Sequence, residues 1–539
     1  MNEELSLADA VVETLAAYGV RRIFGVPGGG SSLDVIEAAA RRGIDFVLTR
    51  GETPAIIMAA VTGELSGAPG AALTTKGPGI ANGANGLAYA LLDRAPMIVL
   101  ADGFDAGALT YQSHQVFDQR ALVAPLTKAA SRLDGAAPMQ EAADLLDIAL
   151  THPRGPVYAE FTASRGRKAV PVAALGNSPR PAVPGPDAES LAAARRLLTQ
   201  ARRPAIVAGL QAIRDPAHAA ALAHLAEALN CPVFPTYKAK GILPDADPRV
   251  IGLYVGGAGE APALARSDLI VLYGADPVEF ALQPWRYPDH PVLDLSLHRH
   301  ERQYMAPEVT VIGALDGTAE ALAAGAVRGE WTDAEMADMR RTLADRLRVT
   351  GPGDITPQHV IDTAVETAPP NARICVDAGA HMLPTMAFWQ ATAPNDVLIS
   401  NGLATMGFAL PAAIAAALHD PERPVIAFTG DGGLAMCLGE IATAVEAGCN
   451  LTVIVYNDAE LSMIGVKQAS SGLSRRGVGF FDIDFAATAR GMGAHGIRCT
   501  RRERIGDAMR EGFDKPGPAV VDIRVDPAGY RDQVKRLRG

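Results

Sequence analysis

The chain has 539 residues, which is more than one hydrophobic core supports, and roughly 150 residues per domain predicts three or four domains. Apolar residues make up 48% and charged residues 20%, a composition typical of a globular protein and not of a disordered one. The formal net charge of -11 is spread along the chain without a basic stripe, which argues against a nucleic-acid partner.

Short β-branched runs alternate along the whole chain with longer Ala- and Leu-rich stretches of helical pattern. Expected strands are Arg22–Val26, Phe46–Leu48, Met97–Leu100, Ala205–Val207, Leu269–Leu272, Val292–Leu295, Ile374–Val376, Val425–Phe428, Leu451–Tyr456 and Ala519–Ile523. Expected helices are Ser6–Tyr18, Pro54–Glu64, Ala188–Thr199, Pro216–Leu229, Pro357–Ala368 and Glu440–Glu446. This alternation predicts an α/β protein with parallel sheets covered by helices on both faces.

Two stretches are predicted to be linkers. Residues 164–187 are rich in Pro, Ala and Gly without periodicity, and residues 327–357 hold a charged helix followed by a Gly-Pro-Gly turn. Cutting there leaves three segments of similar size, each with its own βα alternation. We therefore expect three doubly wound parallel-sheet domains.

The longest apolar-rich run, residues 403–418, is shorter than the roughly 20 residues that span a bilayer, so we expect the start of a buried helix and no membrane segment. The five cysteines are scattered, and the acidic beginning of the sequence is unlike a signal peptide. Both features predict a cytoplasmic protein with reduced thiols.

The strongest motif lies in the last third. The strand at 425–428 runs into Gly430, Asp431, Gly432 and Gly433, and the strand at 451–456 ends at Asn457. Both polar positions follow strands of one βαβ unit, where ligands bind in open α/β sheets. The glycines let backbone N–H groups approach phosphate, and Asp431 and Asn457 offer the oxygen ligands that Mg²⁺ prefers. Taken alone, Gly-Asp-Gly could be an ordinary turn between a strand and a helix. The presence of Asn457 at the end of the second strand favours a metal site instead.

The Gly-Asp-Gly of residues 430–432, followed after 24 residues by a strand-end Asn, resembles the cofactor motif of thiamine diphosphate (ThDP) enzymes. In that family the motif usually closes with Asn-Asn, and the second Asn is a metal ligand. We match it with Asn457, so that Tyr456 replaces the first Asn. The same match implies that the Ala459 carbonyl is a further metal ligand and that Leu461 lies beside the cofactor.

Other segments of the last third resemble the same family. Residues 401–413 are similar to the segment before the diphosphate site in acetolactate synthases. This similarity implies that Met406 bends the cofactor and that the Ala404 carbonyl accepts a bond from its pyrimidine amino group. Gly379, Ala380 and His381 resemble the first diphosphate-contacting loop. A core methionine and a plain βα turn are the alternative interpretations.

The N-terminal third resembles acetolactate synthases as well. The loop at residues 25–30 does not fit G-x-G-x-x-G, which disfavours a nicotinamide oxidoreductase, and it resembles the loop that brings Pro27 and Gly28 to the reactive carbon. Glu52 matches the catalytic glutamate of the family, which shares a proton with N1′ of the pyrimidine and so promotes removal of the C2 proton. A helix-start acid is the alternative for Glu52.

Two more segments complete the resemblance. Residues 74–82 resemble the segment that packs beside the pyrimidine, which implies cofactor contacts from Gly79 and Asn82. Residues 111–118 resemble the segment that holds a Gln or His over the thiazolium, and His114 and Gln115 both fall close to that position. His114 would then serve as an acid/base on the substrate oxygen, whereas a structural histidine is the alternative.

The resemblance implies a pyrimidine-binding domain at 1–165, a central Rossmann-like domain at 187–327 and a diphosphate-binding domain at 355–530. It also implies ThDP and Mg²⁺ as cofactors and a cofactor shared between chains, hence at least a homodimer, and we expect a homotetramer. We expect no FAD, because residues 205–211 lack the glycine run of acetolactate synthases and residues 274–277 depart from their Arg-rich continuation.

The function that the resemblance favours is a 2-oxo acid decarboxylase or carboligase, acting on small 2-oxo acids, aldehydes or acyloins. A lyase for 2-hydroxy ketones or 2-hydroxyacyl-coenzyme A esters is the alternative. An inactive binding subunit with the same fold is a remote one, and the joint presence of Glu52, Asp431 and Asn457 argues against it.

Overall fold

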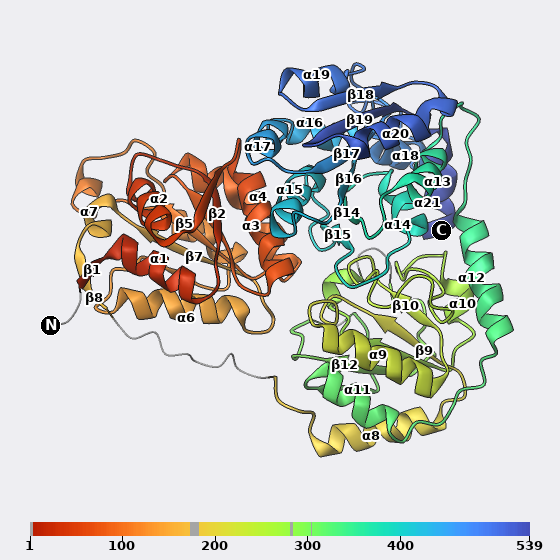
Figure 1. Cartoon of the computed structure of the whole chain (residues 1–539). Coiled ribbons are helices and arrows are strands. Elements are labelled where there is room, and N and C mark those ends of the chain that lie inside the picture. Colours follow the sequence, from red (N-terminus) through yellow and green to blue (C-terminus); the bar gives the residue numbers. More distant parts are fainter. Residues whose placement is uncertain (1–3, 173–182, 281–283, 303) are drawn as a thin grey trace. The chain divides into compact units, whose positions relative to one another are not determined.

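The computed structural model describes residues 4–172, 183–280, 284–302 and 304–539 (Figure 1). It holds three parallel β-sheets, each with helices in the crossovers between its strands, which confirms the expected α/β class. The residues pack into two compact units. Among the described residues, one unit comprises 4–172, 410–422 and 437–449, and the other comprises 183–280, 284–302, 304–409, 423–436 and 450–539.

The N-terminal sheet is six-stranded, in the order β3-β2-β4-β5-β7-β6, with all neighbours parallel. Its strands are β2 (Arg22–Val26), β3 (Asp45–Leu48), β4 (Gly70–Thr74), β5 (Met97–Asp102), β6 (Ala130–Ser131) and β7 (Pro156–Phe161). Its helices are α1 (Leu7–Ala17), α2 (Ser31–Arg42), α3 (Glu52–Ser66), α4 (Pro78–Leu92), α5 (Gln119–Val123), α6 (Pro138–Leu150) and α7 (Ala163–Gly166). A separate antiparallel pair joins β1 (Glu4–Ser6) to β8 (Ala169–Pro171).

Small residues bring the elements of this unit together. On α4, a Cβ built at Gly86 would lie 2.7 Å from the Ile56 Cβ on α3, so a larger residue there would push the two helices apart. The strand order reverses between β2 and β4, which is the topological switch point of the sheet. The loops that follow β2 and β4 are therefore placed where such a sheet binds ligands.

The central sheet is five-stranded and parallel, in the order β10-β9-β11-β12-β13. Its strands are β9 (Pro204–Ala208), β10 (Val233–Pro235), β11 (Leu269–Tyr273), β12 (Val292–Ser296) and β13 (Val309–Ile312). Its helices are α8 (Ala188–Gln200), α9 (Pro216–Leu229), α10 (Ala261–Leu264) and α11 (Leu315–Ala323), and α12 (Asp333–Leu347) follows. Helices α9 and α11 pack side by side (Figure 1). The switch point lies between β9 and β11.

The C-terminal sheet is six-stranded and parallel, in the order β15-β14-β16-β17-β19-β18, with its switch point between β14 and β16. Its strands are β14 (Arg373–Val376), β15 (Val397–Ile399), β16 (Val425–Gly430), β17 (Leu451–Asn457), β18 (His495–Cys499) and β19 (Ala519–Arg524). Helices in this part of the sequence are α13 (Pro357–Thr367), α14 (Met382–Phe388), α15 (Ala409–His419), α16 (Asp431–Met436), α17 (Glu440–Glu446), α18 (Ser462–Ser470), α19 (Phe485–Gly491), α20 (Ile505–Asp514) and α21 (Tyr530–Arg538).

All the strands and helices expected from the sequence are present, with ends that differ by two residues or fewer. The apolar run at 403–418 becomes a buried helix only from Ala409, because Ala404 and Gly407 adopt left-handed backbone angles, with φ of 53° and 75°. The second expected linker contains α12, and residues 173–182 of the first lie outside the described residues. Among the described helices none is long and apolar enough to cross a membrane.

Candidate functional site

A cavity of about 350 Å³ opens at the carboxyl ends of the C-terminal strands. It is lined by residues from the loops after β14, β15, β16 and β17 and by residues of the central domain, all within one compact unit. The predicted site residues that line it are Gly379, Ala380, His381, Ala404, Met406, Gly430, Asp431, Gly432, Gly433 and Leu461. The structure thus brings together most residues expected to contact the diphosphate half of the cofactor.

Asp431 is the first residue of α16, directly after β16, and its side chain is buried. Its Oδ2 accepts hydrogen bonds from the backbone N–H groups of Asp458, at 3.0 Å, and Ala459, at 2.6 Å. Its Oδ1 accepts one from the N–H of Gly432 at 2.7 Å. Burial raises the pKa of the Asp431 carboxyl above its ordinary value, because little water remains to solvate the charge. The carboxylate is therefore held rigidly in a place where a cation would stabilise it.

Asp458, which the sequence analysis left without a role, is the second carboxylate of the cavity. It follows the last residue of β17, and its Oδ2 accepts a hydrogen bond from Ser462 Oγ at 2.7 Å. Burial raises its pKa, and the nearby charge of Asp431 raises it further. Asp431 is buried and Asp458 half-buried, and two such carboxylates repel each other, so a cation between them would be stabilised. Their oxygens are ligands that suit Mg²⁺.

The geometry does not support Asn457 and Ala459 as metal ligands. Asn457 is the last residue of β17, and Asp458, not Asn457, lines the cavity. The Asn457 amide donates to Asp522 at 2.9 Å, and its oxygen accepts from Arg524 at 3.0 Å. The Ala459 carbonyl accepts from the N–H of Phe480 at 3.0 Å. The Asn457 side chain thus joins β17 to β19, whose residue 524 lies opposite it in the parallel register.

His381 is a buried polar residue of the loop after β14. Its Nε2 has no hydrogen-bond partner within the described part of the chain, and its ring lies 5.5 Å from that of Tyr456, centroid to centroid. Burial lowers the pKa of His381 to about 3, so the imidazole is neutral. A Cβ at Gly379 would lie 2.7 Å from this ring. The cavity thus presents a neutral imidazole nitrogen that a ligand would satisfy.

Asp377, which also has no predicted role, holds two of the loops around the cavity together by hydrogen bonds. It accepts hydrogen bonds from the N–H groups of Gly407 and Phe408 and from Thr429 Oγ1, at 2.9 to 3.2 Å. A Cβ at Gly433 would lie only 2.2 Å from its Oδ2. Asp377 therefore fixes the loop that carries Met406 against the end of β16. This contact alone excludes a larger residue at position 433, whether or not Gly433 also contacts a phosphate.

The N-terminal unit holds the second group of predicted residues. Glu52 is the first residue of α3, and its Oε2 accepts a hydrogen bond from the Asn82 amide at 2.5 Å. A Cβ at Gly79 would lie 3.4 Å from Glu52 Oε1 and 2.9 Å from Thr75 Cγ2. Glu52, Gly79 and Asn82 are thus adjacent, as expected if all three contact the pyrimidine.

The remaining predicted residues lie on loops of the same unit. At Gly28 a Cβ would lie 2.1 Å from Thr75 Oγ1, so the loop of Pro27 and Gly28 lies directly against the segment after β4. Gln115 has a left-handed φ of 62°, and its carbonyl oxygen would be 2.7 Å from a Cβ at Gly77. The side chains of His114 and Gln115 are exposed in the single chain.

Comparison with known families agrees with this geometry. Residues 5–122 match the N-terminal TPP binding domain of thiamine pyrophosphate enzymes, residues 191–322 the central domain, and residues 377–523 the C-terminal TPP binding domain. Thiamine pyrophosphate is another name for ThDP. These matches cover well over half of the sequence, and the chain belongs to the thiamine pyrophosphate enzyme family.

Relatives with assigned names cover almost the whole chain. The acetolactate synthase of Bacillus subtilis (strain 168) is 28% identical, over 98% of this chain and 94% of its own length. The probable 2-ketoarginine decarboxylase AruI of Pseudomonas aeruginosa is 29% identical, over 96% and 94%. The pyruvate oxidase of Lactiplantibacillus plantarum is 26% identical, over 95% and 87%. The chain is thus similar throughout to a synthase, a decarboxylase and an oxidase.

Proposed function

We propose that this chain is a Mg²⁺-dependent ThDP enzyme that decarboxylates a 2-oxo acid or joins it to a second carbonyl compound. The observation that carries the proposal is the pair of neighbouring carboxyl groups, the buried Asp431 and the half-buried Asp458, beside a glycine-lined loop in the cavity. A Mg²⁺ ion between these carboxyl groups and a diphosphate would neutralise the negative charge of both.

Several residues of the cavity would hold the cofactor. Asp431 and Asp458 would bind the metal. The family match places the carbonyl ligand two residues after the strand-end ligand, so with Asp458 as that ligand the carbonyl would be that of Glu460, which lines the cavity. His381 would offer its neutral imidazole to a polar group, and Met406 its side chain to the ring system. When bound, ThDP supplies a carbanion at C2 and then an electron sink for the bond that is broken or formed.

Glu52 would move the proton that starts the reaction. Its carboxyl is oriented by the hydrogen bond from Asn82, and its position at the first turn of α3 leaves it half-buried. A carboxyl group in this position shares a proton with N1′ of the pyrimidine and thereby helps to remove the C2 proton. His114 and Gln115 would contact the substrate from the neighbouring loop.

The cavity also contains charges suited to an anionic substrate. Lys467 on α18 and Arg538 on α21 line it, and they are the Lys and Arg side chains among its described lining residues. A 2-oxo acid has a carboxylate that these cations would attract, whereas an acyloin has none. This favours a 2-oxo acid over a 2-hydroxy ketone.

The proposal predicts that turnover requires both ThDP and a divalent metal. A panel of 2-oxo acids and acyloins, with product analysis, identifies the substrate. Dialysis against a chelator should then abolish its turnover, and Mg²⁺ with ThDP should restore it, while either one alone should not. Full turnover by protein free of both would refute the proposal.

A further expected result is that the purified protein is colourless and that FAD does not change its activity. The reason is that residues 205–211, which include most of β9 and the turn that follows it, lack the glycine run of acetolactate synthases. The absorption spectrum of the purified protein and of its heat-released supernatant tests this. Flavin absorbance with one FAD released per chain would contradict it.

We also propose that one cofactor is shared by two chains, so that Glu52 of one chain acts with Asp431 of another in at least a homodimer and, as expected, a homotetramer. Two inactive variants, Glu52→Gln and Asp431→Ala, should then complement each other when they are mixed and reassociated. In an equal mixture about half of the dimers are hybrids, and one of the two sites in each hybrid has both residues intact. About a quarter of the parent activity should therefore return. No recovery in reassociated hybrids, verified by differently tagged chains, would show that each chain builds its own site.

A further inference from the structure

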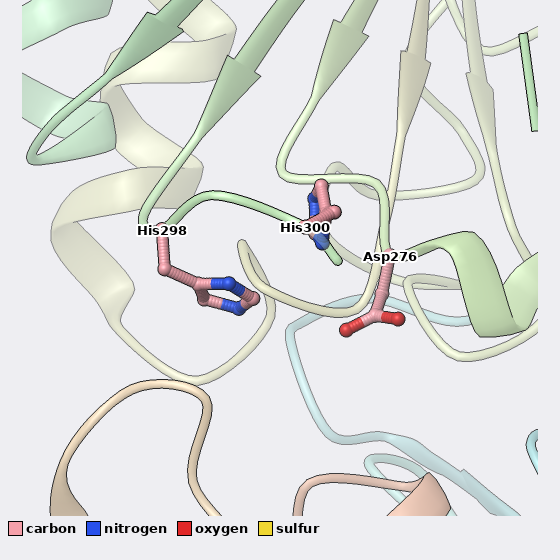
Figure 2. A group of neighbouring side chains, drawn as sticks. All are labelled: Asp276, His298 and His300. Atoms are coloured by element: carbon pink, nitrogen blue, oxygen red, sulfur yellow. The ribbon is translucent and has the colours of Figure 1, made fainter. Parts of the chain in front are cut away.

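The central domain brings together three metal-binding side chains that the proposed function does not use. Asp276 follows β11, and His298 and His300 follow β12, so all three lie at the carboxyl edge of the central sheet (Figure 2). Each offers one ligand atom, and these atoms all lie within 4.8 Å of one another. The cluster is beside the switch point between β9 and β11, where a parallel sheet of this kind binds ligands.

The two histidines are held in place by neighbours. His298 Nδ1 lies 3.2 Å from the Arg299 carbonyl oxygen, which can only accept, so in the neutral imidazole Nδ1 is the protonated nitrogen and Nε2 is the one that can coordinate a metal. His300 Nε2 lies 3.2 Å from Gln211 Nε2 and 3.3 Å from Ser296 Oγ. The Gln211 oxygen accepts from the N–H of Leu297 at 2.7 Å, which fixes that amide beside the ring.

Asp276 is oriented by the backbone. Its side chain is fully buried, and Oδ1 accepts from the N–H of Val278 at 3.1 Å. Its own N–H donates to Glu279 Oε2 at 2.9 Å, which anchors the turn on which it sits. The His298 and His300 rings are 4.8 Å apart, centroid to centroid, and half-buried. An oriented carboxyl thus lies against two imidazoles that are reachable from solvent.

We propose that Asp276, His298 and His300 bind one divalent transition-metal ion of the zinc type in the central domain. Two imidazoles and a carboxylate suit zinc, whereas Mg²⁺ prefers oxygen ligands, so this site and the ThDP–Mg²⁺ site select different ions. Three protein ligands leave a coordination position open to water or an anionic group. The ion joins the loops after β11 and β12 and therefore stabilises the folded domain.

The competing explanation is an ion pair between Asp276 and a protonated histidine, and a titration with the metal alone separates the two. Metal-free protein is saturated with ThDP and Mg²⁺, so that the other site is filled, and is then titrated with ZnCl₂ by calorimetry. We expect one Zn²⁺ bound per chain and a higher thermal unfolding midpoint. Absence of stoichiometric zinc binding would overturn the proposal.

Matched variants tie the binding to this cluster. His298→Ala and His300→Ala should each weaken zinc binding by more than about 10-fold and remove most of the thermal shift. His224→Ala is the control, because His224 lies on α9 of the same domain and pairs at an exposed position with Glu320. It should bind zinc as the parent does.

Co²⁺ provides a readout that does not depend on folding stability. The visible absorption bands of bound Co²⁺ report nitrogen ligation and should be present in the parent and in His224→Ala, and absent in His298→Ala. Zinc affinity and cobalt bands that persist in both His298→Ala and His300→Ala would mean that the metal binds elsewhere.

Discussion

Glu52→Gln should slow C2 deprotonation of bound ThDP by about 10² to 10⁴, the scale expected when general acid–base help is lost. The substitution keeps the size of the side chain and leaves an oxygen able to accept from Asn82, so the local fold at the start of α3 should persist. What changes is the proton shared with N1′. The measurement is hydrogen–deuterium exchange at C2 of the bound cofactor, followed by acid quench.

Cofactor affinity is the control for this experiment. ThDP binding to the Glu52→Gln protein should change little, because the diphosphate and metal contribute most of the affinity. If the variant exchanges C2 as fast as the parent while binding ThDP normally, Glu52 serves only as an acid at a helix start.

Asp458→Ala should weaken Mg²⁺-dependent ThDP binding by more than about 10-fold, because it removes a metal ligand and leaves the diphosphate poorly neutralised. Asp458→Asn should retain much of the affinity, since the amide still offers an oxygen to the metal. Calorimetric titration with ThDP at several Mg²⁺ concentrations measures both effects.

The neighbouring residue supplies the matched control. Asn457→Ala should leave the Mg²⁺ dependence nearly unchanged but reduce the free energy of unfolding by about 1–3 kcal/mol, because Oδ1 of buried Asp522 loses the hydrogen bond from Asn457. Urea denaturation of the apoprotein measures this loss. Normal Mg²⁺ dependence in Asp458→Ala together with its loss in Asn457→Ala would restore Asn457 as the ligand.

Much of the fold could be predicted from the sequence because buried parallel strands are short β-branched runs. The strands at β11 and β17, rich in Leu, Ile and Val, are of this kind. The sequence of β4, Gly-Ala-Ala-Leu-Thr, is not, although all five residues are buried in the middle of a sheet. Its small residues allow close packing: a Cβ at Gly70 would lie 1.7 Å from the Ala59 carbonyl oxygen. Close packing of this sort leaves no periodic signal.

Asp431 lines the cavity and remains a predicted metal ligand, whereas at the second strand end the geometry favours Asp458 over Asn457, a shift of one residue. Strand β17 extends through Asn457, so the first position free to turn into the cavity is Asp458. The sequence contains a signal for this assignment. If Asn457-Asp458 is matched with the Asn-Asn pair that closes the cofactor motif of the family, Asn keeps the first position and an acid takes the second. Strand ends are where sequence patterns are weakest, because the last residue depends on pairing with a neighbour, here β19.

Other parts of the site depend on contacts between distant segments. Asp377 acts through Gly407, Phe408 and Thr429, and no spacing rule links these positions. The cluster of Asp276, His298 and His300 is assembled by two strands that are adjacent in the sheet, with more than twenty residues between them in sequence. A lone Asp and two histidines become a candidate site only when the sheet order is known.

The most direct test of the central claim is the C2 exchange rate of ThDP bound to the unaltered protein with Mg²⁺. We expect exchange far faster than that of free ThDP under the same conditions, because Glu52 and the pyrimidine assist the proton transfer. Bound ThDP that exchanges no faster than free ThDP would mean that this chain binds the cofactor without activating it and is not a ThDP-dependent catalyst.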